Sequence, residues 1–359
     1  MKALGIYTDW RGRKGKPGGC GFYRIVTPFR ALQEKGFPVN YAGEITKHRL
    51  FRKPESAGEL WGRIFGKYDI VWTHHVDTPV GIAQICAARD YFKKKVVIDI
   101  DDDYIHVDKS SPVRRIYYPN SPATQYTLRA IEWADAVTVT TEKLKTLYSR
   151  WNKNVHVLPN YIEPRDWVTQ KKRPFNSPLR IGYAGSWTHE GDLAVVIPSL
   201  MRILNTYNVK FVLFGYGSEV VKLLPANKIE VHAKPTRTFA EWPKRLSKLN
   251  LDIGICPLAN TLFNKGKSYI KYLEYSMNRI PVIATGWASL PYFNVISHKT
   301  NGWLANTSED WEEGLTTLIK NETLRMELGN NGYNTARAFY NINTHCGEWM
   351  KVMEGLYDS

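Results

Sequence analysis

The sequence predicts an α/β fold with two doubly wound parallel-sheet domains that face each other across a cleft. Short apolar runs alternate with amphipathic helical segments, as in sheets whose strands are joined by helices. This alternation stops once, in the proline- and lysine-rich segment 160–178, and then restarts. The length of 359 residues suits two domains of ordinary size. We expect domains at 1–172 and 173–340, and a helix at 341–359 that crosses back to the first domain.

The first half alternates apolar strand patterns with helical ones. The predicted strands are 3–7, 39–41, 69–73, 95–100 and 136–140. The predicted helices are 23–35, 79–92, 122–133 and 141–151. Because ligands of doubly wound sheets bind beyond the carboxyl ends of the strands, the loops after these strands should form the site.

A basic, glycine-rich loop follows the first predicted strand at residues 11–21. Glycines allow the backbone to come close to a ligand, although their spacing is not the G-x-G-x-x-G of dinucleotide-binding loops. Arg24, just inside the next predicted helix, could reach an anion. We therefore expect Gly19, Gly21 and Arg24 beside the ligand.

An aspartate-rich segment, Asp101, Asp102 and Asp103, follows the strand predicted at 95–100. Three successive side chains cannot all point at one atom. Three interpretations therefore stay open: carboxylates that bind or deprotonate an acceptor, a metal site, or capping of a short helix. We expect Asp101 and Asp102 to be catalytic and Asp103 to bind the acceptor.

In the second half the predicted strands are 179–183, 210–214, 229–232, 253–256 and 281–285. Helical periodicity covers 192–205, 238–249, 309–341 and 344–357. Gly185, Ser186 and Trp187 follow the first of these strands and should face the cleft.

The stretch before the last predicted strand is rich in lysine. Lys267, Lys271 and Glu274 have helical spacing and share one face, so a helix here would present two ammonium groups and a carboxylate. A helix start also offers free N–H groups to an anion such as phosphate. Lys265 and Ser268 belong to its polar entrance. The alternative is a solvated face on which Lys271 pairs with Glu274.

Composition narrows the class of protein. Four cysteines without a C-x-x-C favour neither a disulfide framework nor a zinc site, which is typical of a reducing cytoplasm. No apolar run approaches the roughly 18 residues of a membrane span, and no signal peptide is evident. We expect a cytoplasmic protein without an integral membrane segment.

Positive charge is concentrated in the first half. Residues 1–175 carry 30 Lys and Arg against 18 Asp and Glu, out of a net charge of +15 for the chain. This asymmetry indicates an anionic partner, either nucleic acid or the headgroups of a membrane or lipid-linked substrate. A merely soluble basic surface is the alternative. Arg11, Arg13 and Lys14 are the residues expected to bind such an acceptor.

Several motifs together resemble the GT-B glycosyltransferases, in particular the large retaining group that uses nucleotide-sugar donors. They are the glycine-rich loop, Leu158-Pro159-Asn160, and Leu273-Glu274-Tyr275 before the apolar run 281–285. The segment Gly21-Phe22-Tyr23-Arg24 and the aspartate-rich turn look like a bacterial and phage variant. The resemblance implies two Rossmann-like domains, a donor bound mainly by the second, an acceptor bound by the first, and no obligatory metal or cofactor.

The resemblance also implies roles for single residues. Glu274 matches a glutamate that holds the donor ribose, whereas Gly266 stands where similar enzymes place a second glutamate near the donor sugar. The family binds the diphosphate with a basic pair after the first strand of the second domain, and this chain has Ser186 and Glu190 near those places. Lys265, Lys267 and Lys271 would have to supply the missing positive charge. His75 matches a histidine that contacts the sugar, although it could instead cap a turn.

The expected activity is sugar transfer from a UDP-sugar to a hydroxyl acceptor, with retention if no aspartate acts as a general base and inversion if one does. Hydroxymethylated DNA of the phage type is the slightly preferred acceptor. The alternatives are a glycan or lipid-linked carbohydrate, with peripheral membrane contact, and a non-catalytic nucleic-acid-binding protein with this fold.

Overall fold

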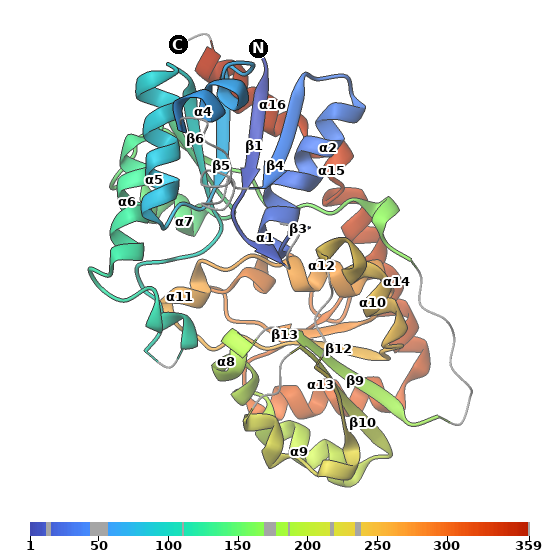
Figure 1. Ribbon diagram of the computed structural model, residues 1–359. Helices are drawn as coiled ribbons and strands as arrows, with labels where there is room; N and C mark the ends of the chain where they lie inside the picture. Colours follow the sequence, from blue (N-terminus) through green and yellow to red (C-terminus); the bar gives the residue numbers. More distant parts are fainter. Residues whose placement is uncertain are drawn as a thin grey trace.

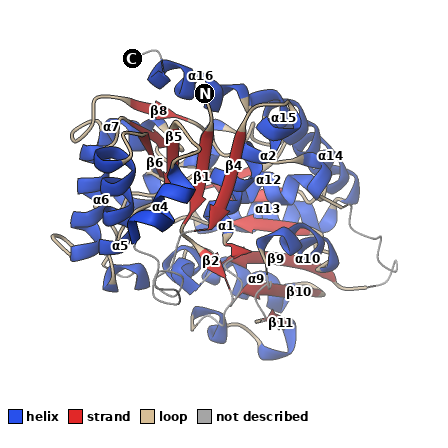
Figure 2. Ribbon diagram, turned by 45° about the horizontal axis from the view of Figure 1, so that its top comes forward, coloured by secondary structure: helices blue, strands red, loops and turns tan. Residues whose placement is uncertain are grey.

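The computed structural model describes residues 1–11, 16–43, 57–109, 111–168, 177–185, 187–215, 219–233 and 238–357. Two parallel sheets, one in each half of the chain, are covered by helices (Figures 1 and 2). The predicted fold class is therefore confirmed.

The first sheet has the order β4-β1-β5-β6-β7-β8, and all its neighbouring strands are parallel. Its strands are β1 Ala3–Tyr7, β4 Val39–Gly43, β5 Ile70–His74, β6 Lys95–Ile100, β7 Ala136–Val139 and β8 Val155–Val157. The chain moves from β1 to one neighbour and then returns to the other side, so the strand order reverses at β1. Such a switch point opens a crevice at the carboxyl ends of the strands.

A continuous helical segment follows β1 and the glycine-rich loop. It consists of α1 Gly19–Gly21, a π-helical turn Phe22–Val26 and α2 Thr27–Glu34, so the helix begins earlier than the predicted residue 23. The other helices of this half are α4 Ala57–Phe65, α5 Pro79–Cys86 with a π turn Ala87–Tyr91, α6 Pro122–Trp133 and α7 Glu142–Tyr148. The short strands β2 Trp10–Arg11 and β3 Lys16–Pro17 pair antiparallel beside β1.

The second sheet has the order β11-β10-β9-β12-β13-β14, again with parallel neighbours. Its strands are β9 Leu179–Gly185, β10 Val209–Gly215, β11 Ile229–His232, β12 Ile253–Cys256, β13 Val282–Thr285 and β14 Trp303–Ala305. Its helices are α8 Glu190–Ala194, α9 Ile197–Thr206, α10 Trp242–Lys248, α11 Leu262–Lys265, α12 Ile270–Met277, α13 Ser308–Lys320 and α14 Glu322–Phe339. Its switch point lies between β9 and β12.

The end of the chain packs on the first half. Helices α15 Ile342–His345 and α16 Gly347–Tyr357 follow α14, and α15 lies beside α2 (Figures 1 and 2). Tyr161 stacks on His345 with ring centroids 4.3 Å apart. Trp349 is fully buried in one apolar core with Phe29.

That core continues from the first half into the second, where it includes Phe214 and Trp242. Two further cores cover the other faces of the two sheets. The halves are therefore joined by apolar packing as well as by the chain. In the described part of the chain, no helix is long and apolar enough to cross a bilayer.

Candidate functional site

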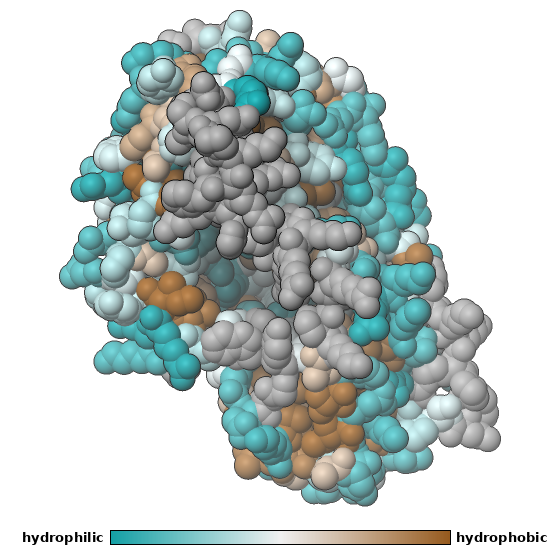
Figure 3. All heavy atoms as spheres, in the orientation of Figure 1, coloured by the Kyte–Doolittle hydropathy of each residue, from teal (hydrophilic) through white to brown (hydrophobic). Residues whose placement is uncertain are grey.

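A cavity of about 310 Å³ lies between the two halves, where the carboxyl ends of both sheets meet. Figure 3 shows the molecule hollowed between its halves on this face. Gly19, Tyr23 and Asp102 line the cavity from the first half, and Gly185 and Lys271 line it from the second. Its volume is in the usual range for ligand pockets.

The glycine-rich loop brings the start of the first helix against β1. Oδ1 of Asp9 accepts a hydrogen bond of 2.7 Å from the backbone N–H of Gly21. A Cβ at Gly21 would lie 2.2 Å from that oxygen, so a side chain has no room there. Gly19 lines the cavity as predicted, whereas Gly21 does not and instead closes the helix onto Asp9.

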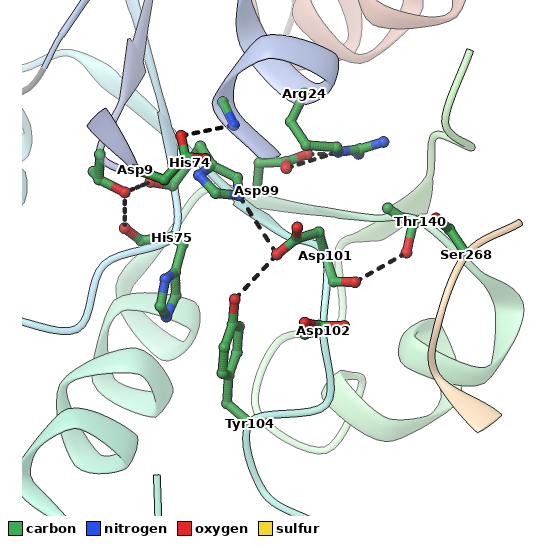
Figure 4. Close-up of polar contacts among 12 residues, drawn as sticks. Asp9, Arg24, His74, His75, Asp99, Asp101, Asp102, Tyr104, Thr140 and Ser268 are labelled. Carbon is green, nitrogen blue, oxygen red and sulfur yellow. Dashed lines mark hydrogen bonds and ion pairs between the residues drawn. The ribbon is translucent and has the colours of Figure 1, made fainter. Parts of the chain in front are cut away.

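Arg24 borders the cavity, but its guanidinium is committed to the first half (Figure 4). Nε and Nη2 donate to the two carboxylate oxygens of Asp99 at 2.9 and 2.7 Å, and both side chains are fully buried. Nη1 donates to the carbonyl of Leu158 and to Oδ1 of Asn160. Arg24 therefore lies beside the cavity, as predicted, with its charge neutralised by Asp99, and its contact with a ligand stays a prediction.

A polar link crosses from Arg24 to the second half. Nδ2 of Asn160 donates to Oγ of Ser268 at 2.8 Å. Ser268 lines the cavity, as predicted. Asn160 lies in the segment that joins the two sheets and also lines the cavity, so this hydrogen bond ties that segment to the second half beside the cavity.

The three aspartates diverge, as the sequence required. Oδ1 of Asp101 lies 3.5 Å from Nε2 of His74 and accepts from the hydroxyl of Tyr104 (Figure 4). Asp102 forms an ion pair of 2.8 Å with Lys267 of the second half. Both line the cavity.

Asp103 does not line the cavity. Its Oδ1 accepts from the backbone N–H groups of Ile105 and His106 at 3.0 and 2.9 Å, and its Oδ2 lies 2.8 Å from Nδ1 of His106. It therefore caps a turn, which was one of the three interpretations, and this corrects its expected role in acceptor binding.

Burial and mutual repulsion set the charges of this cluster. Burial raises the pKa of Asp102 to about 6. Repulsion from the Asp101 carboxylate also raises this pKa, whereas the attraction of Lys267 lowers it. Burial alone would lower the pKa of His74, but the Asp101 carboxylate raises it to about 9. His74 is then the cation that balances Asp101.

One group of side chains has the spacing of a metal site. A sulfur, a nitrogen and an oxygen of Cys20, His74 and Asp101 all lie within 4.8 Å of one another. The ion pair between His74 and Asp101 accounts for this arrangement without a metal.

His75 is buried behind the cavity and is not among its lining residues. Its ring stacks on Tyr104 with centroids 4.1 Å apart, and the hydroxyl of Tyr117 lies 3.4 Å from its Nε2 (Figure 4 shows Tyr104). Its backbone has a φ of +41°, a conformation uncommon outside glycine. Burial lowers the pKa of His75 to about 4. The expected contact to a sugar is corrected, because two aromatic rings enclose the imidazole.

In the second half, α12 begins at Ile270, so Lys267 lies in the turn before the helix and not on its face as predicted. Lys271 lies in the first turn and lines the cavity. Its ammonium forms no ion pair or hydrogen bond with any residue that the structure describes, and lies 5.5 Å from the ring centroid of Tyr183. Burial lowers its pKa.

Glu274 does not pair with Lys271. Its Oε1 accepts a hydrogen bond of 2.8 Å from the hydroxyl of Tyr23, across the two halves. Burial raises the pKa of Glu274 to about 7, although Tyr23 and Lys271 favour its charged form. Tyr23 was not predicted as a site residue, and only its place beside Arg24 in the quoted motif pointed to it.

Comparison with solved structures gives matches over nearly the whole length of both chains. Sucrose-phosphate synthase from Thermosynechococcus elongatus is 14% identical over 100% of both chains, with a TM-score of 0.70. HepE from Anabaena, in complex with UDP, is 14% identical over 99% of this chain and 100% of its own, with a TM-score of 0.64. A glycosyltransferase from Rickettsia africae is 13% identical over 99% of each chain, with a TM-score of 0.66.

The chain has the GT-B fold. Identities of this size establish the fold alone. Comparisons with models of protein families and with curated proteins gave no match.

Position 266 explains a departure from the GT-B sequence pattern. A Cβ at Gly266 would lie 2.8 Å from Cδ2 of Leu144 and 3.3 Å from Cβ of Asp103, both in the first half. Oγ1 of Thr141 donates to the Gly266 carbonyl at 3.3 Å. A side chain here would require the end of the Leu144 side chain in the other half to move, so the glycine fits the close contact between the halves. The neighbouring Lys265 does not line the cavity.

The loop after β9 is the place where the GT-B resemblance expects positive charge. Gly185 lines the cavity, as predicted. Ser186 lies outside the described residues, and of Trp187 only the backbone is described, as the start of a 3-10 turn. His189, which ends this turn, lines the cavity and was not predicted. Among the residues expected to bind the acceptor, Arg13 and Lys14 lie outside the described residues, and of Arg11 only the backbone in β2 is described.

Proposed function

We propose that this protein is a glycosyltransferase that moves a sugar from a nucleotide-sugar donor to a hydroxyl acceptor. The observation that carries the proposal is the half-buried Lys271, whose ammonium forms no ion pair or hydrogen bond with a described residue and which lines a cavity shared by both halves of a GT-B fold. A lone buried cation is costly unless an anion binds beside it.

The chemistry of sugar transfer supplies such an anion. As the bond between the sugar and the diphosphate breaks, negative charge develops on the departing oxygens, and fixed cations and N–H groups that face this charge lower the barrier. Lys271 and Lys267 line the cavity together, as does Ile270, the first residue of α12. Glu274, on the next turn of α12, would accept hydrogen bonds from the ribose hydroxyls.

UDP is the favoured nucleotide. HepE, which has the same fold, was crystallised with UDP, with UDP and glucose, and with UDP-glucose. We place the donor mainly on residues 173–340 and the acceptor on residues 1–172, with 341–359 as the helix that braces the first domain. The sugar is a hexose or a pentose.

Transfer with retention is the favoured stereochemistry, because the motifs of the chain resemble those of the large retaining GT-B group. Inversion needs a carboxylate that removes the proton of the acceptor: Asp101 already pairs with His74, and Asp102 would take this role if its pair with Lys267 opened when a donor binds. A front-face transfer needs no such base.

Hydroxymethylated DNA is the slightly favoured acceptor, and the positive charge in the first half of the chain suits either this acceptor or an anionic lipid-linked one. A glycan or lipid-linked carbohydrate is the alternative acceptor. A second candidate function is that of a nucleic-acid-binding protein without enzymatic activity. Gly266 supports it, because similar enzymes have at this position a glutamate that contacts the donor sugar.

The donor site is tested by calorimetry of UDP binding with Lys271→Ala. Removing a charge-assisted hydrogen bond should weaken binding by about ten- to one-hundredfold, equivalent to about 1.5–3 kcal/mol. Lys265→Ala, six residues away and outside the cavity, is the matched control and should bind as the wild type does. Equal affinity of the Lys271 variant and the wild type would remove this role.

The activity is tested by mass spectrometry of hydroxymethylated DNA and of lipid-linked glycans after incubation with a panel of nucleotide sugars. A mass increase of one sugar on DNA supports the favoured acceptor, and an increase on the glycan supports the alternative. DNA binding without transfer of any sugar would favour the non-catalytic candidate.

A further inference from the structure

His189 is held in one orientation at the cavity wall. Its Nδ1 lies 2.8 Å from Oδ2 of Asp192, and because a carboxylate only accepts, Nδ1 carries the hydrogen and donates it. Nε2 is then the second ring nitrogen, and no residue in the described ranges forms a hydrogen bond with it. The side chain lines the cavity, so this nitrogen is available to a ligand.

Asp192 is itself fixed from two further elements. Its Oδ1 accepts from the backbone N–H of Ala259 at 2.9 Å and from Nδ2 of Asn264, at the end of the Thr261-capped α11, at 2.5 Å. Both Asp192 and Asn264 are buried. Such support from a second layer of residues fixes the tautomer and direction of an imidazole, as it does in metal sites and catalytic triads.

The charged groups around His189 are mostly positive. Lys267 and Lys271 approach it from the turn before α12 and from α12 itself, and Asp192 is the negative group on its own side. The 3-10 turn Pro112–Arg115 of the first half lies against the turn that ends in His189, and it carries Arg114 and Arg115. Burial and the two lysines lower the pKa of His189 to about 4, although Asp192 opposes this shift, so the imidazole is neutral at pH 7.

We infer that His189 takes up a proton when a nucleoside diphosphate binds in this cavity and donates it in a hydrogen bond from Nε2 to a phosphate oxygen. This inference rests on the proposed function and adds a third donor to the diphosphate site. The anion would cancel the repulsion from Lys267 and Lys271, while Asp192 remains as the counter-charge of the imidazolium. The proton comes from solvent, and no covalent bond forms or breaks.

The sign of the pH dependence follows from linkage. A ligand that raises the pKa of a group binds more tightly where that group is protonated, so affinity should increase as the pH falls toward neutrality. The greatest slope is about tenfold in Kd per pH unit for one linked proton.

Calorimetry in two buffers of different ionisation enthalpy counts the protons taken up per nucleotide. UDP, GDP and dTDP serve as probes at pH 7, with wild type, His189→Asn and the control His156→Asn, which lies away from the cavity. Asn keeps an N–H for Asp192 but cannot be protonated. Wild type and His156→Asn should take up nearly one proton more per bound nucleotide than His189→Asn. Protons taken up or released by the nucleotide itself are the same for all three proteins and cancel in this difference.

An equal proton count in wild type and His189→Asn, with binding retained, would overturn the role of His189 and leave the proposed function standing. Absence of binding by all three nucleotides to wild type would overturn both. ¹⁵N-histidine NMR of the wild type needs no variant: one of the nine histidine rings should change from neutral to protonated when nucleotide is added at pH 7. No change in any ring would also overturn the inference.

Discussion

Glu274 has two partners that compete for its carboxylate, the hydroxyl of Tyr23 in the structure and, in the proposed function, the ribose of a donor. Glu274 is 8% exposed, and burial raises the pKa of its carboxyl group from an ordinary value of 4.5 to about 7. Between these two values the folded protein binds more protons than the unfolded chain. Glu274 therefore makes the protein less stable as the pH rises through this window.

Glu274→Gln should remove this pH dependence. The free energy of unfolding of the variant should increase relative to that of wild type by up to about 3 kcal/mol between pH 4.5 and pH 8, because wild type loses this stability and one pKa unit corresponds to about 1.4 kcal/mol. Urea unfolding at a series of pH values measures the difference. Glu354→Gln, on the exposed face of α16, is the control and should follow wild type. Parallel curves for Glu274→Gln and wild type would contradict the prediction.

Spacing in the sequence identified Lys271 and Glu274 because both lie on one short helix. It could not identify Tyr23, which is 251 residues away from Glu274, or His189, whose orientation depends on Asn264. It gave no sign that Asp99 neutralises Arg24 or that Tyr104 stacks on His75. Contacts between distant segments decide these roles.

The helical segment from α1 to α2 is anchored to the sheet by the ion pair between Arg24 and Asp99. Thr138 of β7 also donates to the Asp99 carboxylate at 2.6 Å, so the pair joins two strands and a helix. The π-helical turn contains both Tyr23, which reaches the second half, and Arg24, which is bound to the first. Such turns are often found at functional sites.

Asp99→Asn should destabilise the protein by about 3–5 kcal/mol, because it leaves the Arg24 charge buried without a partner. The matched control is Asp166→Asn, which breaks the partly exposed pair with Arg30 and should cost less than about 1 kcal/mol. Denaturant unfolding at one pH compares the two variants. Similar losses from both would show that burial does not set the strength of the Arg24 pair.

Most elements could be predicted from apolar runs and their periodicity. Residues 3–7, 95–100, 229–232 and 253–256 form strands with the predicted bounds. The edge strands β8 and β14 were missed, because three residues each are too short to show alternation. The helix predicted at 192–205 is divided into α8 and α9, since Pro198 in the first turn of α9 lacks a backbone N–H.

At the scale of the whole molecule, the halves meet through polar groups around the cavity. Lys267 bridges to Asp102, Tyr23 bridges to Glu274 and Asn160 bridges to Ser268. A ligand in the cavity therefore competes with these contacts for the same side chains. We expect that binding of the ligand loosens the contacts between the two halves.

The DNA acceptor in the proposed function predicts a steep dependence on salt. If the positive first half neutralises about four phosphates, raising salt from 50 to 200 mM should weaken DNA binding roughly 150-fold, because bound counterions are released. Fluorescence anisotropy with hydroxymethylated and unmodified duplexes measures this slope. Absence of DNA binding even at 50 mM salt would favour the carbohydrate acceptor.

Gly266 limits how this protein can be redesigned. Its missing side chain is the space into which Leu144 of the opposite half fits. A glutamate at position 266 would require the end of the Leu144 side chain to move. Such a variant is therefore best paired with a smaller residue at position 144, so that a change in one half is matched by a compensating change in the other.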